Sequence, residues 1–163
     1  MEYYPIIIVL HIVFAGMWLT SFLLSPLFKS AIYSSKNKIG EKKFIHFYLI
    51  YSNLLGIVSS IGVLVTGIVL VILNPGFGFF SMSANHWLAT KQIIMLVILV
   101  IIGGFIVPTA KKLRLSIGAD LENASQLSEE SYKDLNKLFK LGLAINVLVL
   151  INFLLALTHN YLG

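Results

Sequence analysis

The chain has 163 residues, of which 58% are hydrophobic and only 12% are charged, and its mean hydropathy is +0.90. This composition excludes an ordinary water-soluble domain and is typical of an integral membrane protein. The absence of Cys excludes disulfides and thiolate–metal sites. The formal net charge of +5 comes from residues beside apolar segments, where anionic lipid attracts them, so it indicates membrane lipid and no nucleic-acid partner.

Four apolar runs account for most of the chain. Each exceeds the ~20 residues that a helix needs to cross a hydrocarbon core of ~30 Å. The first run is predicted to be a transmembrane helix and not a signal peptide, because Glu2 replaces a basic leader region and no cleavage site of small residues follows. Short connections then predict an all-α fold, an integral membrane up-down-up-down four-helix bundle in one domain, 1–163. The predicted helices cover about residues 3–28, 45–73, 87–110 and 139–162.

The basic residues predict the orientation in the membrane. All but Lys91 lie in the first and third connections, so the positive-inside rule places both connections in the cytoplasm. The second connection, Asn74 to Asn85, has no charge, and we expect it and both termini outside. The basic residues are Lys29, Lys36, Lys38, Lys42 and Lys43 in the first connection, and Lys111, Lys112, Arg114, Lys133, Lys137 and Lys140 in the third.

Two local patterns refine the helices. Ser128 followed by Glu129 and Glu130 predicts a helix start, with acidic residues at the positive end of the helix dipole. Small residues in the second and third predicted helices allow close packing of helices in lipid, or a slot for a flat ligand. These are Gly56, Ser59, Ser60, Gly62, Thr66, Gly67, Gly103 and Gly104.

Three ionisable residues are predicted at similar depth near the outer side: His11, Lys91 and His159. An ionisable group inside a membrane is costly and usually faces the bundle interior. His11 lies roughly 10 Å into its helix, at 1.5 Å per residue, and Trp18, which shares its face, is a further candidate for contact with a cofactor. The imidazole needs either a hydrogen bond across the bundle or a metal, and two imidazoles from facing helices can bind haem iron.

The third predicted helix opens with His86, Trp87 and Lys91. Lys91 is one turn after Trp87 and could pair with a haem propionate, a lipid phosphate or a quinone oxygen, or extend to the interface. His86 and His159 are the candidates for a second metal ligand beside His11. The sequence contains no zinc-type spacing of ligands, no catalytic triad and no phosphate-binding loop, which argues against a conventional hydrolase.

Two segments of the chain resemble a known family. The run from His11 through Trp18 to Pro26 and the run Trp87-Leu88-Ala89-Thr90-Lys91 are similar to the first and third helices of HemJ-type protoporphyrinogen oxidases and of the related copper-resistance D family. The resemblance implies b-type haem bound through His11, with Lys91 near the porphyrin carboxylates. The family has a basic residue where this chain has Leu27, and an Asn-Glu-x-Pro motif that is missing here from residues 140–146.

These observations leave several functions open. The leading hypothesis is a b-type haem cytochrome that exchanges electrons with a quinol or an external redox protein, with His11 as one axial ligand and His159 or His86 as the other. Whether it is an enzyme stays open, and the alternative oxidoreductase is a HemJ-like protoporphyrinogen IX oxidase. Copper handling through His11, His86, His159 and Met17 and a scaffold role are further alternatives, and a homo-oligomer is compatible with each.

Overall fold

The computed structural model describes the backbone of residues 3–36, 38, 40–83, 85–122 and 127–162, and their side chains except at 121–122 and 159–162. The helices are α1 (Tyr4–Ser34), α2 (Gly40–Leu73), α3 (His86–Ile101), the π-helical turn η1 (Ile102–Ile106), α4 (Val107–Glu122) and α5 (Glu129–Leu162).

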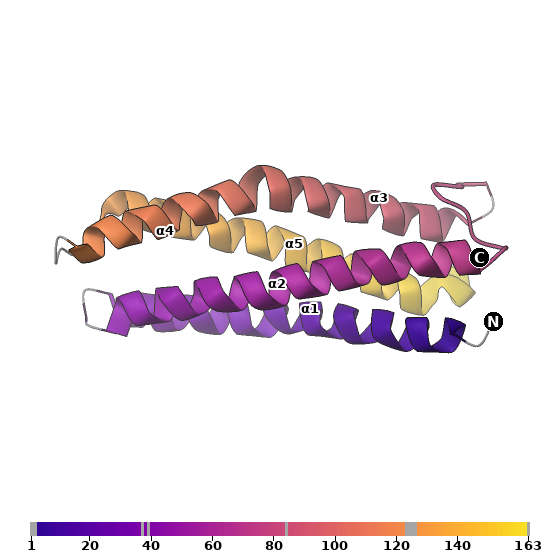
Figure 1. Ribbon diagram of the computed structural model, residues 1–163, viewed down its shortest axis with the longest axis horizontal. Helices are drawn as coiled ribbons and strands as arrows, with labels where there is room; N and C mark the ends of the chain where they lie inside the picture. Colours follow the sequence, from indigo (N-terminus) through magenta and orange to yellow (C-terminus); the bar gives the residue numbers. More distant parts are fainter. Residues whose placement is uncertain (1–2, 37, 39, 84, 123–126, 163) are drawn as a thin grey trace.

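The described residues form an up-down-up-down helical bundle (Figure 1). The segments α3, η1 and α4 form one continuous rod, so the bundle has four helices long and apolar enough to cross a membrane. The all-α membrane fold predicted from the sequence is therefore confirmed. The start of α1 and the end of α5 lie at the end of the bundle that also holds the α2–α3 connection, and α1 meets α2 and α4 meets α5 at the other end (Figure 1).

The helices are longer than the apolar runs that predicted them. At 1.5 Å per residue, the 34 residues of α2 extend over about 51 Å, which exceeds the hydrocarbon thickness by about 20 Å. The additional turns lie at the end where α1 joins α2, which we call the basic end. Its core resembles that of a soluble bundle, because Ile32, Ile45, Leu113 and Leu135 are almost completely buried there.

Polar contacts join the helices at the basic end. The Tyr132 hydroxyl of α5 donates to the buried Glu41 carboxylate of α2, and Lys112 lies 2.7 Å from Glu130. The predicted start of the last helix is confirmed: α5 begins at Glu129, and the Ser128 hydroxyl accepts a 3.2 Å hydrogen bond from the Ser131 amide.

The α2–α3 connection is held by amide side chains. Gln92 accepts a 2.5 Å hydrogen bond from the Phe80 amide and donates to the Gly78 carbonyl at 3.3 Å. Phe80 has a φ of 55°, a left-handed conformation uncommon outside glycine. Asn85 donates to the Gly76 carbonyl at 2.7 Å. This connection is consequently folded over the start of α3.

The helices of the bundle do not all pack equally closely. The most extensive backbone contact is between α1 and α2, while α5 packs against α1, α3, η1 and α4. The backbones of α2 and the α3–α4 rod lie farther apart, and the rod bows outward near its middle (Figure 1). The bow coincides with η1, where the Val107 amide bonds to the Ile102 carbonyl. Pro108 cannot donate to the Gly104 carbonyl, which accounts for the widened turn.

Candidate functional site

His11 is held against the neighbouring helix α2 by a side-chain hydrogen bond to Thr66, and the Val63 carbonyl of the same helix also interacts with its imidazole. Its Nδ1 lies 2.8 Å from the Thr66 hydroxyl oxygen, and that hydroxyl lies 2.5 Å from the Gly62 carbonyl, to which it donates. The Thr66 proton is therefore committed, so Thr66 accepts the Nδ1 proton of His11. This arrangement selects one tautomer and leaves the lone pair on Nε2 available to a ligand.

Two glycines of α2 allow α1 to approach closely. A Cβ on Gly67 would lie 3.4 Å from His11 Cε1, and a Cβ on Gly62 would overlap the Phe14 ring. Larger residues at these positions would separate the helices and break the bond from His11 to Thr66. We call His11, Phe14, Gly62, Thr66 and Gly67 the α1–α2 seam. At these positions the small residues serve close packing, one of the two roles that the sequence allowed.

Lys91 lies near the seam from the other side of the bundle. Its ammonium is close enough to His11 for its charge to act on the imidazole, and it lies 5.7 Å from the centre of the Trp87 ring. Asn152 of α5 donates to the Lys91 carbonyl at 3.3 Å, so α5 also packs here. The Asn152 Oδ1 is buried and has no hydrogen-bond partner in the part of the chain that the structure describes. The structure therefore places the Lys91 charge within electrostatic range of His11, although the two residues lie 80 positions apart in the sequence.

The other predicted site residues have different positions. His86 is exposed at the first residue of α3. The backbone of α5 continues through His159, but its side chain lies outside the described part of the structure. Trp18 is only 4% exposed and packs with Ile98 and Ile145 toward the middle of the bundle. Among the described side chains, no three His, Asp or Glu residues gather in a metal-binding cluster.

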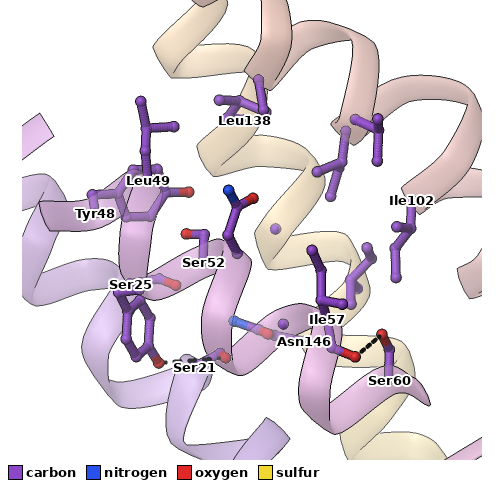
Figure 2. Close-up of a pocket in the computed structure, with 18 of the residues that line it drawn as sticks. Ser21, Ser25, Tyr48, Leu49, Ser52, Ile57, Ser60, Ile102, Leu138 and Asn146 are labelled. Atoms are coloured by element: carbon purple, nitrogen blue, oxygen red, sulfur yellow. Dashed lines mark hydrogen bonds between the residues drawn. The ribbon is translucent and has the colours of Figure 1, made fainter. Parts of the chain in front are cut away.

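Sequence reasoning missed a cavity in the middle of the bundle. It has a volume of about 290 Å³ and lies between α1, α2, η1, α4 and α5. Figure 2 shows Ser21, Ser25 and Tyr48 on one side and Ile102 on the other. We call this space the central crevice. It is lined by Trp18, Ser21, Ser25, Tyr48, Leu49, Tyr51, Ser52, Asn53, Gly56, Ile57, Ser60, Ile102, Ile106, Val107, Ala110, Arg114, Leu138, Gly142, Ile145 and Asn146.

Several polar groups of the crevice are already satisfied by the protein. Tyr51 donates to the Ser21 hydroxyl at 3.4 Å, and Ser60 donates to the Ile57 carbonyl at 3.1 Å. Asn146 differs: it is only 6% exposed, and its amide has no hydrogen-bond partner among the described residues. Among the described residues, the hydrogen-bonding capacity of this amide is unused, so it is available to water or to a ligand in the crevice.

The sequence does contain signals for this crevice. Ser21 and Ser25 share a face of α1 at a spacing of four, and Asn146 interrupts an apolar run in α5. Pro108 closely follows Gly103 and Gly104, a combination that disturbs a helix. Each signal alone is weak, because a Ser in a membrane helix can bond to its own backbone.

Comparisons of the chain with protein-family models, with curated proteins and with solved structures find no match. Any function must therefore be argued from the two sites just described.

Proposed function

We propose that this protein is a b-type haem-binding membrane protein that exchanges electrons with a quinol or an external redox partner. The observation that carries the proposal is the bond from His11 Nδ1 to Thr66. Metal-bound histidines typically donate the second ring N–H to a protein acceptor, which fixes the tautomer and raises the basicity of the coordinating nitrogen. His11 donates its Nδ1 proton in the same way, as an axial ligand would. The resemblance of the run from His11 to Pro26 to the first helix of HemJ-type proteins supports the same assignment.

Lys91 would supply the charge that complements the propionates. Lys91 is half-buried beside Trp87. The charge of its ammonium interacts electrostatically with the His11 imidazole. A cation at this depth is costly unless an anionic group compensates it. When bound, the haem would supply a one-electron centre whose potential depends on its axial ligands and on the polarity around it. The role of the chain is to hold the imidazole, the cation and the apolar surroundings in place.

His159 and His86 remain the candidates for the second axial position. His159 is in the last turn of α5, and Asn152 lies two turns before it on the same face. His86 would have to turn inward from its exposed position. Replacing each by Ala separates the two: the true ligand's variant changes the oxidised and reduced spectra, and the other does not.

The test is the visible spectrum of the purified protein, oxidised and reduced, for wild type, His11→Ala and His46→Ala. We expect a Soret band with sharp reduced b-type peaks in wild type and in His46→Ala, because His46 is exposed near the basic end. His11→Ala should lose the signal. A wild type that stays colourless after reconstitution with haem would overturn the proposal, as would an unchanged spectrum in His11→Ala.

A further inference from the structure

We propose that the central crevice binds the head group of a membrane-dissolved quinone, a flat ring with hydrogen-bond-accepting oxygens and an apolar tail. The inference rests on the electron-exchange function proposed above. It identifies where the quinone or quinol of that function would bind. The site is distinct from the seam that holds His11, since His11 does not line the crevice.

The first argument is the unpartnered amide of Asn146. Its side chain is more than nine-tenths buried, lines the crevice and has no partner among the described residues. Its NH₂ group can donate two hydrogen bonds. Ser25 and Ser52 line the same wall and add hydroxyl groups (Figure 2). A quinone oxygen would accept from the Asn146 amide, whose donors no described residue uses.

The second argument is the shape and polarity of the crevice. The wall formed by α1, α2 and α5 carries the hydroxyl and amide groups, whereas the wall formed by η1 and α4 presents Ile102, Ile106 and Ala110. A flat ring satisfies both walls, because its edge accepts hydrogen bonds and its face packs on aliphatic groups. The volume of about 290 Å³ is at the small end of ligand pockets, which suits one ring.

The third argument is access from the bilayer. Ile57 of α2 and Val107 of α4 both line the crevice, yet they are 51% and 55% exposed. The crevice thus opens toward lipid between these helices, which gives an apolar tail a way out. A fully enclosed cavity would have no such path.

The fourth argument is the charge at the margin. Arg114, the single Arg of the chain, lines the crevice, and no described lining residue is acidic. Among the described residues it has neither a hydrogen-bond nor an ion-pair partner. This positive field favours electron-rich oxygens and disfavours a cationic ligand.

The experiment is photolabelling of the full-length protein in lipid nanodiscs with an azidoquinone that carries a decyl tail. Labelled peptides are mapped by mass spectrometry, and the label is competed with unlabelled decylbenzoquinone, with decanoate or with decylbenzene. We expect labelling in α2, η1 or α5 that only decylbenzoquinone competes with micromolar potency. Asn146→Leu should weaken this competition at least tenfold, and Asn136→Leu, an exposed Asn at the basic end, should leave it unchanged.

A second pair of variants tests the space itself. A Cβ on Gly56, which lines the crevice, or on Gly16, which is exposed in α1, would meet nothing within 4 Å. Gly56→Leu should fill the crevice and reduce specific labelling at least tenfold, and Gly16→Leu should not. Both variants are first checked for a monodisperse elution profile.

Two results of these experiments overturn the proposal of a quinone site in the crevice. Equal competition by decanoate would mean that an anionic amphiphile binds at Arg114. Labelling unaffected by Asn146→Leu and Gly56→Leu would mean that the quinone binds outside the crevice. The haem spectrum of the same preparation keeps the two proposals separate: a coloured protein without specific labelling overturns the quinone site alone, and a colourless protein with specific labelling overturns the haem alone.

Discussion

The α1–α2 seam and the central crevice use the same kind of residue with opposite results. In the seam, Gly62 and Gly67 are covered by Phe14 and His11. In the crevice, Gly56 of the same helix meets open space. The difference lies in the opposite wall, because α1 runs close to α2 while the α3–α4 rod bows away at η1. A small residue in a membrane helix therefore produces close packing or a cavity depending on the helix that faces it.

The largest expected effect comes from adding one methyl group to the seam. Gly62→Ala places a Cβ inside the Phe14 ring, so the helices must separate, and overpacking of this kind costs roughly 2–3 kcal/mol of unfolding free energy. Gly56→Ala should change it by less than about 0.5 kcal/mol, since its Cβ enters open space. Unfolding in mixed micelles, followed by circular dichroism, measures both. Equal losses in the two variants would remove the distinction between seam and crevice.

The next largest effect is expected on removing the Thr66 hydroxyl, which accepts a hydrogen bond from His11. Thr66→Val keeps the shape of the side chain but removes the hydroxyl that accepts from His11 Nδ1. Loss of such an outer-shell bond typically weakens metal binding about 10- to 100-fold. We therefore expect haem to transfer to apomyoglobin faster from Thr66→Val than from wild type. Thr158→Val is the control, because among the described residues the Thr158 hydroxyl bonds only to the Leu154 carbonyl of its own helix.

Haem transfer at the wild-type rate in Thr66→Val would assign the His11–Thr66 bond to packing alone. The seam would then remain a structural feature, and the proposal that His11 binds haem would lose the observation that carries it.

A smaller effect of opposite sign is expected in the crevice. Asn146→Leu replaces an unpartnered amide, 6% exposed, by an apolar group of similar size. Removing a buried polar group that lacks a partner should stabilise the protein by about 1 kcal/mol when no quinone is added. The same micelle unfolding experiment checks this. A destabilised variant would show that the amide has a structural role in the ligand-free protein, which would weaken the first argument for a binding site.

The sequence predicted the fold well because membrane helices follow from length and apolarity alone. The start of α5 at Glu129 was also predicted, since Ser128 and the acidic residues after it form a local signal. The helix ends at the basic side were less predictable: α1 continues to Ser34 because Ile32 packs in a core of its own there. A search for long apolar runs does not predict such a core, because charged residues interrupt the apolar residues that form it.

The candidate site was predicted only in part. His11 and Lys91 stood out because ionisable residues are rare in apolar segments, and the structure places them near each other. Thr66 as the partner of His11, and Asn146 in the crevice, depend on how four helices are rotated relative to one another. That rotation is set by side-chain packing over the whole bundle, which a single sequence does not reveal.

The smallest effect tests why the crevice exists. Pro108→Ala restores an amide that can bond to the Gly104 carbonyl, so η1 should return toward α-helix and bring Ile102 and Ile106 closer to α2. The free energy of unfolding should change by less than about 1 kcal/mol, because membrane helices satisfy a widened turn in other ways, here with the bond from the Val107 amide to the Ile102 carbonyl. Specific azidoquinone labelling should nevertheless fall severalfold, while Pro26→Ala in α1 should leave it unchanged. If Pro108→Ala labels like wild type, the bow of the α3–α4 rod is imposed by its neighbours and not by the proline, and Gly103 and Gly104 become the next residues to replace.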